Sequence, residues 1–288
     1  MAIVGDKKYS VLMSVYYKEN PEYFRLSIES MLNQTLKPDE IVIVKDGLLT
    51  DQLNEIIDYY TLNYPDLFTI VPLERNVGLG LALNVGLKFC RNDLVARMDT
   101  DDISLQQRCE LQVNEFLKDR QLSICGTMID EFYNNPENVI TSRLVPTEHE
   151  EIFKFSKRRS PFNHPTVMFK KSEVLRCGGY RDIERKEDFD LFVRMLNNGC
   201  KAMNIDKSLL LFRANEGNYE RRKSWVNCKN SIKVMYDFWK KGYSSTMDLI
   251  VVTLGHIIVY ILPIPLLKIF SDNLLRKKVR DDSSLSCW

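Results

Sequence analysis

Residues 94–102 read Leu-Val-Ala-Arg-Met-Asp-Thr-Asp-Asp, and the interpretation of the whole chain starts from this stretch. Leu94–Met98 is an apolar run too short for a helix, so it predicts a buried strand. Three carboxylates follow it within four residues, those of Asp99, Asp101 and Asp102. Carboxylates this close repel one another, and a bound cation relieves the repulsion. The stretch therefore predicts a strand whose carboxyl end carries an acidic site.

Three similar apolar runs precede this strand, and they predict strands at Ser10–Val15, Glu40–Val44 and Phe68–Val71. Amphipathic helical patterns separate them. Asn20 and Thr50 are favourable N-caps for the first two helices, and Pro21 occupies the first helical position of one of them. The third helix carries Leu79, Leu83 and Leu87. This alternation predicts right-handed parallel crossovers and an α/β fold whose ligands bind beyond the carboxyl ends of the strands.

The pattern becomes less regular after Ile124. It predicts a strand near Thr166–Phe169, a turn at Gly178-Gly179, a helix over Glu187–Asn197 and a strand near Leu209–Phe212. Thr147 and Glu150 have the spacing of a capping box, which predicts a helix start there. No repeat or low-complexity linker separates the two halves, so we expect one α/β domain with a C-terminal appendage.

The composition excludes several classes of protein. The 288 residues include 40 Lys+Arg and 39 Asp+Glu, and the net charge of +1 disfavours a dedicated nucleic-acid binder. The 7 cysteines contain no C-x-x-C pair, which disfavours a zinc ribbon or a disulfide framework and favours reduced thiols. The first ten residues carry charges and no apolar run, so no signal peptide is expected.

The acidic stretch allows two interpretations. Its all-oxygen ligands favour Mg²⁺ or Mn²⁺, and such ions are usually shared with substrate phosphates. Alternatively, Asp102 or Ser104 caps a helix that begins near Leu105, since both residue types are favoured caps. The position at the carboxyl end of a strand favours the metal site.

Two helix starts are further candidates. Gly78-Leu79-Gly80 does not have the spacing of a dinucleotide fingerprint, but Asn76 and Gly78 could form the turn into a helix whose N-terminus faces a phosphate. Glu187 and Asp188 open the predicted helix over 187–197. Acids in a first turn often only interact with the helix dipole, and a catalytic role requires that they face the same cleft as Asp101.

Five motifs occur in the order in which family 2 glycosyltransferases have them, and the chain resembles that family over about residues 9–225. They are Ser10–Tyr17, Asp46-Gly47, Asn76–Leu79, Asp99–Asp102 and Glu187-Asp188. The resemblance implies the GT-A nucleotide-diphospho-sugar transferase fold, a Rossmann-like mixed and mainly parallel sheet flanked by helices. Asn163–Thr166 and Gly178–Tyr180 are similar to the branch that makes bacterial capsule, exopolysaccharide or O-antigen.

The resemblance implies roles for the residues around the nucleotide. Asp46 resembles the carboxylate that reads the uracil edge of a UDP-sugar, and Asp99 the acid near the ribose. Asp101 resembles the metal ligand of the D-x-D motif, which implies Mn²⁺ or Mg²⁺ as cofactor. Val15 and Tyr17 would flank the nucleoside, although packing at the strand end explains them equally well.

Further residues are assigned to the reaction and to its substrates. Asp188 resembles the general base of inverting members, and Glu187 and Asn76 are counted with the substrate-binding residues. His164 lies in a loop suited to the acceptor or the diphosphate, although a structural hydrogen bond is an equal alternative. Many relatives show Arg-x-His where this chain has Arg213-Ala-Asn, so a histidine metal ligand is not expected there and Arg213 could contact phosphate instead.

The C-terminal part differs from the rest of the chain. We expect a catalytic domain over 1–245, with a nucleotide-binding half at 9–125 and an acceptor half at 126–225, and a membrane-associating segment at 246–288. Leu249–Leu267 holds 19 residues without Asp, Glu, Lys or Arg, with basic residues on both sides.

This segment predicts peripheral association through residues 249–280 with an anionic membrane surface, on the inner face of the cytoplasmic membrane. Pro263 and Pro265 interrupt the apolar run and disfavour a clean span. A helix pair packed on the catalytic domain, or a contact between two copies, is the alternative.

The sequence as a whole predicts a metal-dependent inverting glycosyltransferase. Its donor would be a nucleotide sugar, most simply a UDP-sugar, and its acceptor a glycan or a lipid-linked oligosaccharide. The alternatives are a nucleotidyltransferase that makes NDP-sugars, a phosphatase with Asp99 as nucleophile, and a non-catalytic membrane-attached scaffold. Each explains fewer of the motifs.

Overall fold

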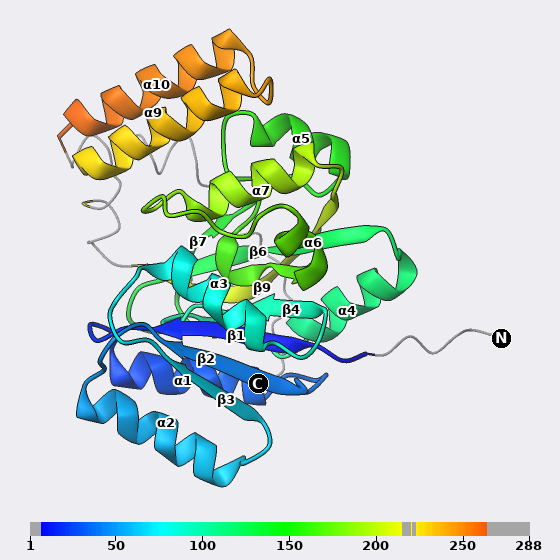
Figure 1. The fold of residues 1–288 in the computed structure, drawn as a ribbon, viewed down its shortest axis with the longest axis vertical. Coiled ribbons are helices and arrows are strands. Elements are labelled where there is room, and N and C mark those ends of the chain that lie inside the picture. Colours follow the sequence, from blue (N-terminus) through cyan, green and yellow to red (C-terminus); the bar gives the residue numbers. More distant parts are fainter. Residues whose placement is uncertain (1–6, 215–219, 221–222, 264–288) are drawn as a thin grey trace.

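One sheet of nine strands runs through the part of the chain that the computed structural model describes, residues 7–214, 220 and 223–263 (Figure 1). The strand order is β3-β2-β1-β4-β8-β6-β9-β5, with β7 paired to β6. Four strands of the nucleotide-binding half are mutually parallel: β1 (Ser10–Val15), β2 (Glu40–Lys45), β3 (Phe68–Pro72) and β4 (Leu94–Arg97). The four predicted strands and their parallel arrangement are confirmed.

The remaining strands make the sheet mixed. They are β5 (Ile103–Ser104), β6 (Leu122–Phe132), β7 (Val139–Arg143), β8 (Met168–Lys170) and β9 (Lys201–Arg213). Strand β8 runs antiparallel to both β4 and β6, whereas β6 and β9 are parallel. The insertion of β8 joins residues 126–225 to residues 9–125 in one sheet, which is the predicted GT-A-type arrangement.

Four helices lie between these strands and after them, and the first two begin where their caps predict. They are α1 (Pro21–Leu32), α2 (Asp51–Asn63), α3 (Leu79–Phe89) and α4 (Arg108–Lys118). The side chain of Asn20 accepts hydrogen bonds from the backbone at the start of α1, and Thr50 does the same for α2. These bonds satisfy amides that have no partner within the helix.

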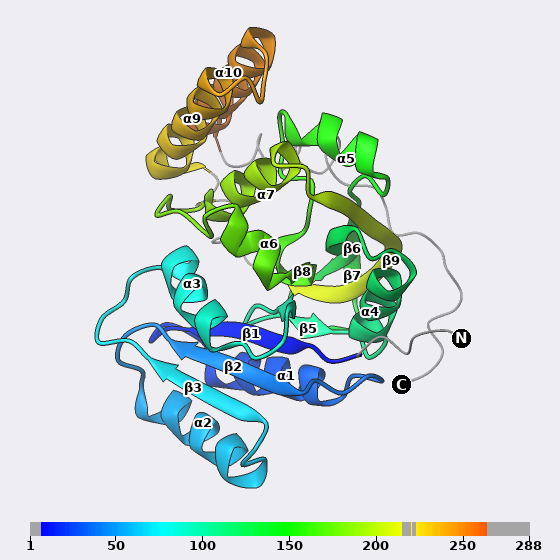
Figure 2. The ribbon, with the colours of Figure 1, turned by 45° about the vertical axis from the view of Figure 1, so that its right-hand side comes forward.

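Helices cover both faces of the sheet, as Figures 1 and 2 show. Apolar residues of α1, α2 and α4 pack on one face, around Met13 and Ile43. Helix α3 packs on the other face around Leu12, together with α5 (His149–Ser156), α6 (Lys171–Arg176) and α7 (Glu187–Asn197). Alternate residues of β1 thus point to opposite faces, as expected of a buried strand.

Several local predictions are wrong. No helix begins near Leu105, because Ile103–Ser104 pairs with β9 and α4 starts only at Arg108, after the N-cap Gln107. Asp102 therefore caps no helix, and the capping alternative to an acidic site is lost.

Thr147 and Glu150 also form no capping box. Helix α5 starts after Glu148 without a side-chain cap, and the carbonyl of Thr147 accepts a hydrogen bond from the backbone of Asn204. The strand expected at 166–169 is shorter, because His164–Thr166 forms a 3-10 turn before β8.

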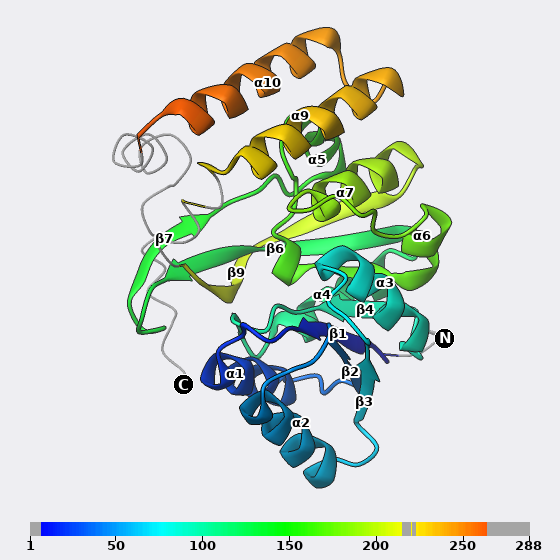
Figure 3. The same cartoon turned by 60° about the vertical axis from the view of Figure 1, so that its left-hand side comes forward.

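Two C-terminal helices form a hairpin on the outside of the acceptor half (Figures 1 and 3). They are α9 (Trp225–Lys240) and α10 (Thr246–Ile261), and α10 starts with a capping box between Ser245 and Asp248. None of the helices in the described part of the chain combines the length and the apolar content needed to cross a membrane. Residues 264–288, which include part of the predicted membrane segment, lie outside the described residues.

Candidate functional site

Polar side chains gather at one edge of the sheet, where β1, β2 and β4 have their carboxyl ends. The first turns of α3 and α7 and the end of β9 complete this edge. Parallel strands bring their carboxyl ends to the same side, so segments that are far apart in the sequence meet there. The predicted site residues come from these segments.

The acidic cluster after β4 forms as predicted. Asp99, Asp101 and Asp102 each offer a carboxylate oxygen, and these oxygens lie within 4.8 Å of one another. Burial and the charge of Asp99 raise the pKa of Asp101 to about 7, and burial raises that of Asp102 well above its usual range. The Oδ2 atom of Asp102 is buried and has no hydrogen-bond partner among the described residues. Crowded oxygen ligands and an unpartnered carboxylate atom fit Mg²⁺ or Mn²⁺.

The loop that carries the cluster is fixed from both sides. Asp102 Oδ1 accepts a hydrogen bond of 2.9 Å from the backbone N–H of Arg213, whose Nε donates to the carbonyl of Asp101, also at 2.9 Å. The guanidinium of Arg213 lies 3.7 Å from the ring centroid of Tyr23 and 4.6 Å from that of Phe132. Arg213 thus lies beside the acidic cluster and orders the backbone of that loop.

Glu19 is a member of the site that sequence reasoning missed. It lies in the loop after β1, and its Oε2 accepts a hydrogen bond of 2.5 Å from Thr100 Oγ1. Burial raises the pKa of Glu19, and the charges of Asp99 and Arg213 also act on it. The glutamate therefore belongs to the electrostatic environment of the acidic cluster.

Arg97 is a buried cation at the centre of the site, and it too was missed. Its side chain is 1% exposed and forms an ion pair with Asp99, while Nε and Nη1 have no partner among the described residues. Its positive charge lowers the pKa of Asp101 on one side and of Glu187 and Asp188 on the other, against the larger effect of burial. The two acidic groups therefore share one cation. A charged residue inside an otherwise apolar strand was the signal in the sequence.

Asp46 connects β2 to the first turn of α3. Its Oδ1 accepts a hydrogen bond of 2.7 Å from the N–H of Val77, and its Oδ2 one of 3.1 Å from the N–H of Gly78. Next to it Gly47 has φ +87°, and a Cβ there would lie 2.7 Å from the backbone N of Asn76. The Asp-Gly pair thus holds the 76–78 turn against the end of β2. Each carboxylate oxygen retains a further lone pair for a ligand.

Glu187 and Asp188 open α7 beside the first turn of α3. A Cβ added to Gly80 would lie 3.0 Å from the Cβ of Glu187, so the two helix starts are in contact. Burial and the charge of Asp188 raise the pKa of Glu187 to about 7, and burial raises the pKa of Asp188. A carboxylate with a raised pKa can accept a proton near neutral pH.

His164 lies next to Tyr180, and its Nε2 is 3.0 Å from the tyrosine hydroxyl. Burial lowers the pKa of His164 well below its ordinary value, and the charge of Arg97 lowers it further. Asn84 of α3 bonds both the N–H and the carbonyl of Tyr180, at 2.8 and 2.7 Å. Burial therefore favours the neutral form of the histidine, which belongs to the contact between residues 9–125 and 126–225.

The two residues expected beside the nucleoside differ in exposure. Val15 is fully buried and belongs to the core cluster around β1. Tyr17 is 51% exposed, with its ring in an edge contact with that of Tyr16. Tyr17 is therefore available to stack on a ligand, whereas the side chain of Val15 packs inside the domain.

Replacement of Glu187 by glutamine gives a first prediction. Folding raises the pKa of this carboxyl from 4.5 to about 7, so the folded protein favours its protonated form. The stability that the protonated carboxyl contributes is present at low pH and is lost as the pH rises through 7. The shift corresponds to roughly 3 kcal/mol at pH 8. We expect Glu187→Gln to raise the Tm at pH 8 in the presence of EDTA, and to change it little at pH 4.5. A lower Tm at pH 8, measured by differential scanning fluorimetry, would contradict this.

Comparison with characterised sequences is consistent with this geometry. A family model described as glycosyl transferase family 2 matches residues 10–181. The chain is 39% identical, over 89% of its length and 92% of the relative, to the Escherichia coli protein named UDP-Gal:alpha-D-GlcNAc-diphosphoundecaprenol beta-1,3-galactosyltransferase. It is 35% identical to the amylovoran biosynthesis glycosyltransferase AmsE of Erwinia amylovora, over 78% of this chain and 84% of that protein.

Solved structures share the fold. The chain is similar to S. aureus TarS 1–349, with a TM-score of 0.54 and 19% identity over 78% of this chain and 65% of that one, so it spans about two thirds of that structure. The mannosyltransferase PcManGT from Pyrobaculum calidifontis, in complex with GDP-Man and Mn²⁺, gives a TM-score of 0.62 at 15% identity, over 92% of this chain and 75% of that one. At these identities the likeness shows the fold alone.

Proposed function

The chain belongs to glycosyl transferase family 2, and from this premise we propose that it is a metal-dependent inverting enzyme. It transfers a hexose from a UDP-sugar to a lipid-linked glycan in the synthesis of a bacterial surface polysaccharide. One observation carries the mechanism. The acidic cluster after β4 and the acids at the start of α7 both lie within the field of the same buried cation, Arg97.

The names of the relatives support the substrate class. The E. coli relative is named for UDP-galactose as donor and for a diphosphoundecaprenol-linked sugar as acceptor. AmsE is named for the biosynthesis of amylovoran. Neither name describes a nucleotidyltransferase, which was the first alternative that the sequence left open.

The donor end of the site is built from the loops after β1, β2 and β4. Tyr17 supplies an exposed ring for the base, and Asp46 and Asp99 supply carboxylates for the uracil and the ribose. Asn76 lies on the turn that Asp46 holds, with its Nδ2 3.3 Å from the carbonyl of Asp46. The first turn of α3 follows, and a helix N-terminus favours an anionic group.

Asp101, together with Asp99 and Asp102, would hold Mg²⁺ or Mn²⁺ next to the diphosphate. When bound, such an ion supplies Lewis-acid stabilisation of the negative charge that develops on the leaving nucleoside diphosphate. The protein contributes a rigid set of oxygen ligands, because Arg213 and Thr100 fix the loop that carries them.

Asp188 acts as the general base. An acceptor hydroxyl attacks the anomeric carbon of the donor, and its proton passes to the carboxylate of Asp188. The bond between the anomeric carbon and the diphosphate oxygen breaks as the new glycosidic bond forms, and the electron pair leaves with UDP. A single displacement of this kind inverts the anomeric configuration. Glu187 contacts the substrates beside it.

The test is a donor screen that measures UDP release from several UDP-sugars in the presence of Mn²⁺. We expect one UDP-sugar to be turned over well above the others, and a lipid-linked sugar diphosphate to accelerate the release. GDP-mannose, which carries guanine in place of uracil, serves as the control donor. Turnover of GDP-mannose in preference to every UDP-sugar would refute the assignment of Asp46, and the absence of turnover and of UDP binding would refute the function.

A further inference from the structure

The α9–α10 hairpin has an outer face that the catalytic site does not use. Its inner side is fixed to the domain, because Val234, Met235 and Phe238 of α9 pack against Phe189 and Val193 of α7. The start of α10 is held by an ion pair of 2.6 Å between Asp248 and Arg158. The hairpin is therefore anchored without any contribution from its outer face, which we define as the solvent-exposed side of both helices.

A long row of apolar side chains covers the α10 part of this outer face. Met247, Ile250, Leu254, Ile258 and Ile261 follow one another at spacings of three or four residues, and each is exposed, Leu254 by 54% and Ile258 by 53%. Spacing of this kind places side chains on one stripe of a helix. Contiguous exposed apolar surface of this kind marks an interaction site in a soluble protein.

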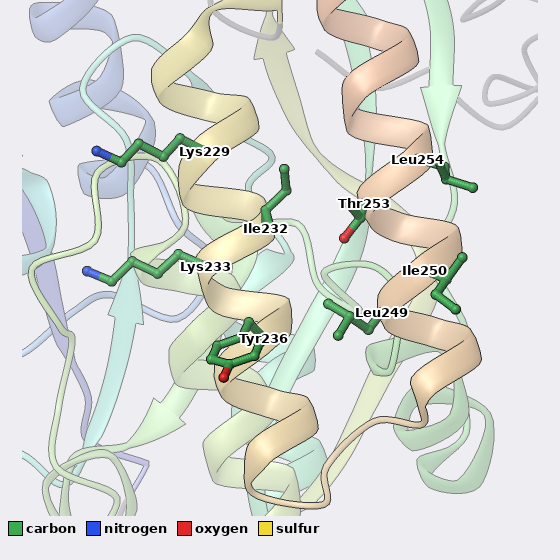
Figure 4. A pocket seen from close by; sticks show the side chains of 8 residues that line it. All are labelled: Lys229, Ile232, Lys233, Tyr236, Leu249, Ile250, Thr253 and Leu254. Atoms are coloured by element: carbon green, nitrogen blue, oxygen red, sulfur yellow. The ribbon is translucent and has the colours of Figure 1, made fainter.

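A groove of about 600 Å³ lies between the two helices on the same face (Figure 4). Leu249, Ile250 and Leu254 of α10 line it, together with Lys229 and Lys233 of α9. Both lysine side chains extend away from the groove at its edge (Figure 4). Apolar lining next to ammonium groups fits a ligand that has acyl chains and an anionic headgroup.

Aromatic rings complete the outer face. The rings of Trp225 and Tyr260 join α9 to α10 with centroids 5.4 Å apart, and those of Tyr236 and Trp239 lie 5.7 Å apart. Trp225 is 56% exposed and Trp239 is 40% exposed. Tryptophan and tyrosine, with an apolar body and a polar group, are enriched at the boundary between lipid and water.

Lysines outnumber acids on the hairpin. Within residues 225–261, all of which the structure describes, the two acids Asp237 and Asp248 are each within 4.0 Å of an arginine of the domain. Lys229, Lys233, Lys240 and Lys241 are exposed. The outer face is therefore positive as well as apolar. Two copies joined through it would bring together more lysines than acids, whereas phosphate groups complement the excess of lysines.

We propose that the outer face of the α9–α10 hairpin docks onto a bilayer containing anionic phospholipid. The apolar row of α10 enters the boundary of the acyl chains, and the lysines of α9 contact the phosphates. Most of the apolar row lies within the segment that the sequence indicated, whereas Lys229 and Lys233 of α9 are charges that the sequence did not indicate. This proposal rests on the hairpin alone. It goes beyond the proposed function, because it does not depend on which reaction the domain catalyses. Because α9 packs on α7, which begins with Glu187 and Asp188, docking also brings the catalytic acids close to the lipid surface.

The experiment uses the full chain with Trp288→Phe, so that all tryptophan emission comes from Trp225 and Trp239. Vesicles of phosphatidylcholine alone are compared with vesicles of equal parts phosphatidylcholine and phosphatidylglycerol. We expect a blue shift of the emission and co-sedimentation with the anionic vesicles, both weakened by high salt.

Two variants and a matched control test the assignment. Leu254→Glu with Ile258→Glu should reduce the partition coefficient at least tenfold, since each replaces an apolar side chain of the row by a charge that cannot enter the acyl chains. Lys229→Glu with Lys233→Glu should reduce binding to the anionic vesicles by about tenfold or more. Leu62→Glu changes a leucine of α2 that is even more exposed, at 81%, and should leave binding unchanged. All these side chains are exposed, so we expect the substitutions to leave the fold intact. An unchanged Tm verifies that each variant folds.

Three outcomes would overturn the proposal. Binding that all the hairpin variants retain would show that another surface meets the lipid. A dimer in the absence of lipid that Leu254→Glu dissociates would assign the face to a second copy. Emission that is blue-shifted before vesicles are added, and unchanged by them, would assign the face to the chain's own residues 264–288.

Discussion

The variant Asp101→Asn should lose sugar transfer by about 10²- to 10³-fold, because a bound divalent ion stabilises the charge of the leaving diphosphate. Asparagine keeps the shape of the side chain but removes the charge that the ion requires. The measurement is UDP release with the donor that the screen identifies, in Mn²⁺ and in EDTA. EDTA should reduce the activity of the unmodified protein by a similar factor.

Thermal stability separates this loss from misfolding. Burial and the charge of Asp99 already hold the pKa of Asp101 at about 7, so a neutral side chain there relieves repulsion. We therefore expect the metal-free Tm of Asp101→Asn to equal or exceed that of the unmodified protein at pH 8, while the increase in Tm on addition of Mn²⁺ disappears. Asp66→Asn, at an exposed position in the turn before β3, is the matched control and should change neither value. Transfer that survives both Asp101→Asn and EDTA would exclude the metal role.

The variant Asp188→Asn should lose transfer by about 10²- to 10⁴-fold while it still binds UDP, because proton removal from the acceptor is lost and the donor site is intact. UDP affinity is measured by calorimetry in the presence of Mn²⁺. Asp182→Asn, at an exposed position shortly before α7, is the control and should keep full transfer.

The pH dependence gives the base a second test. A general base must be deprotonated, and burial raises the pKa of Asp188. The rate should therefore fall as the pH decreases through a value above the ordinary range of an aspartate. If Glu187→Gln abolishes transfer while Asp188→Asn keeps it, the two acids have the opposite roles to those proposed.

Local sequence signals predicted the nucleotide-binding half well. Short runs of Val, Ile and Leu between capped helices leave few alternatives, so all four strands and the N-caps Asn20 and Thr50 are confirmed. The acidic cluster was predicted for a similar reason, since its three members are nearly consecutive. The helix over Glu187–Asn197 is also confirmed, with the same limits.

Interactions between distant segments explain what the sequence did not predict. Ser104 is in a strand because β9 lies beside it, which no neighbouring residue of the sequence indicates. Glu19 belongs to the site only because Thr100, which follows β4, bonds to it. Arg97 is central because the fold brings acids from two segments to the same buried cation. Pairings of this kind depend on tertiary structure and leave no periodic trace in the sequence.

Acids outnumber cations around Arg97, and this excess bears on the order in which the nucleotide and the divalent ion bind. Five acids of the site, Glu19, Asp101, Asp102, Glu187 and Asp188, are subject to the field of Arg97 or Arg213, and burial raises the pKa of each. A nucleoside diphosphate is itself an anion and is repelled by such a group of carboxylates when they are ionised. We therefore expect the nucleotide to enter with the divalent ion or after it, and the affinity for UDP to report how fully the acidic cluster is occupied by metal.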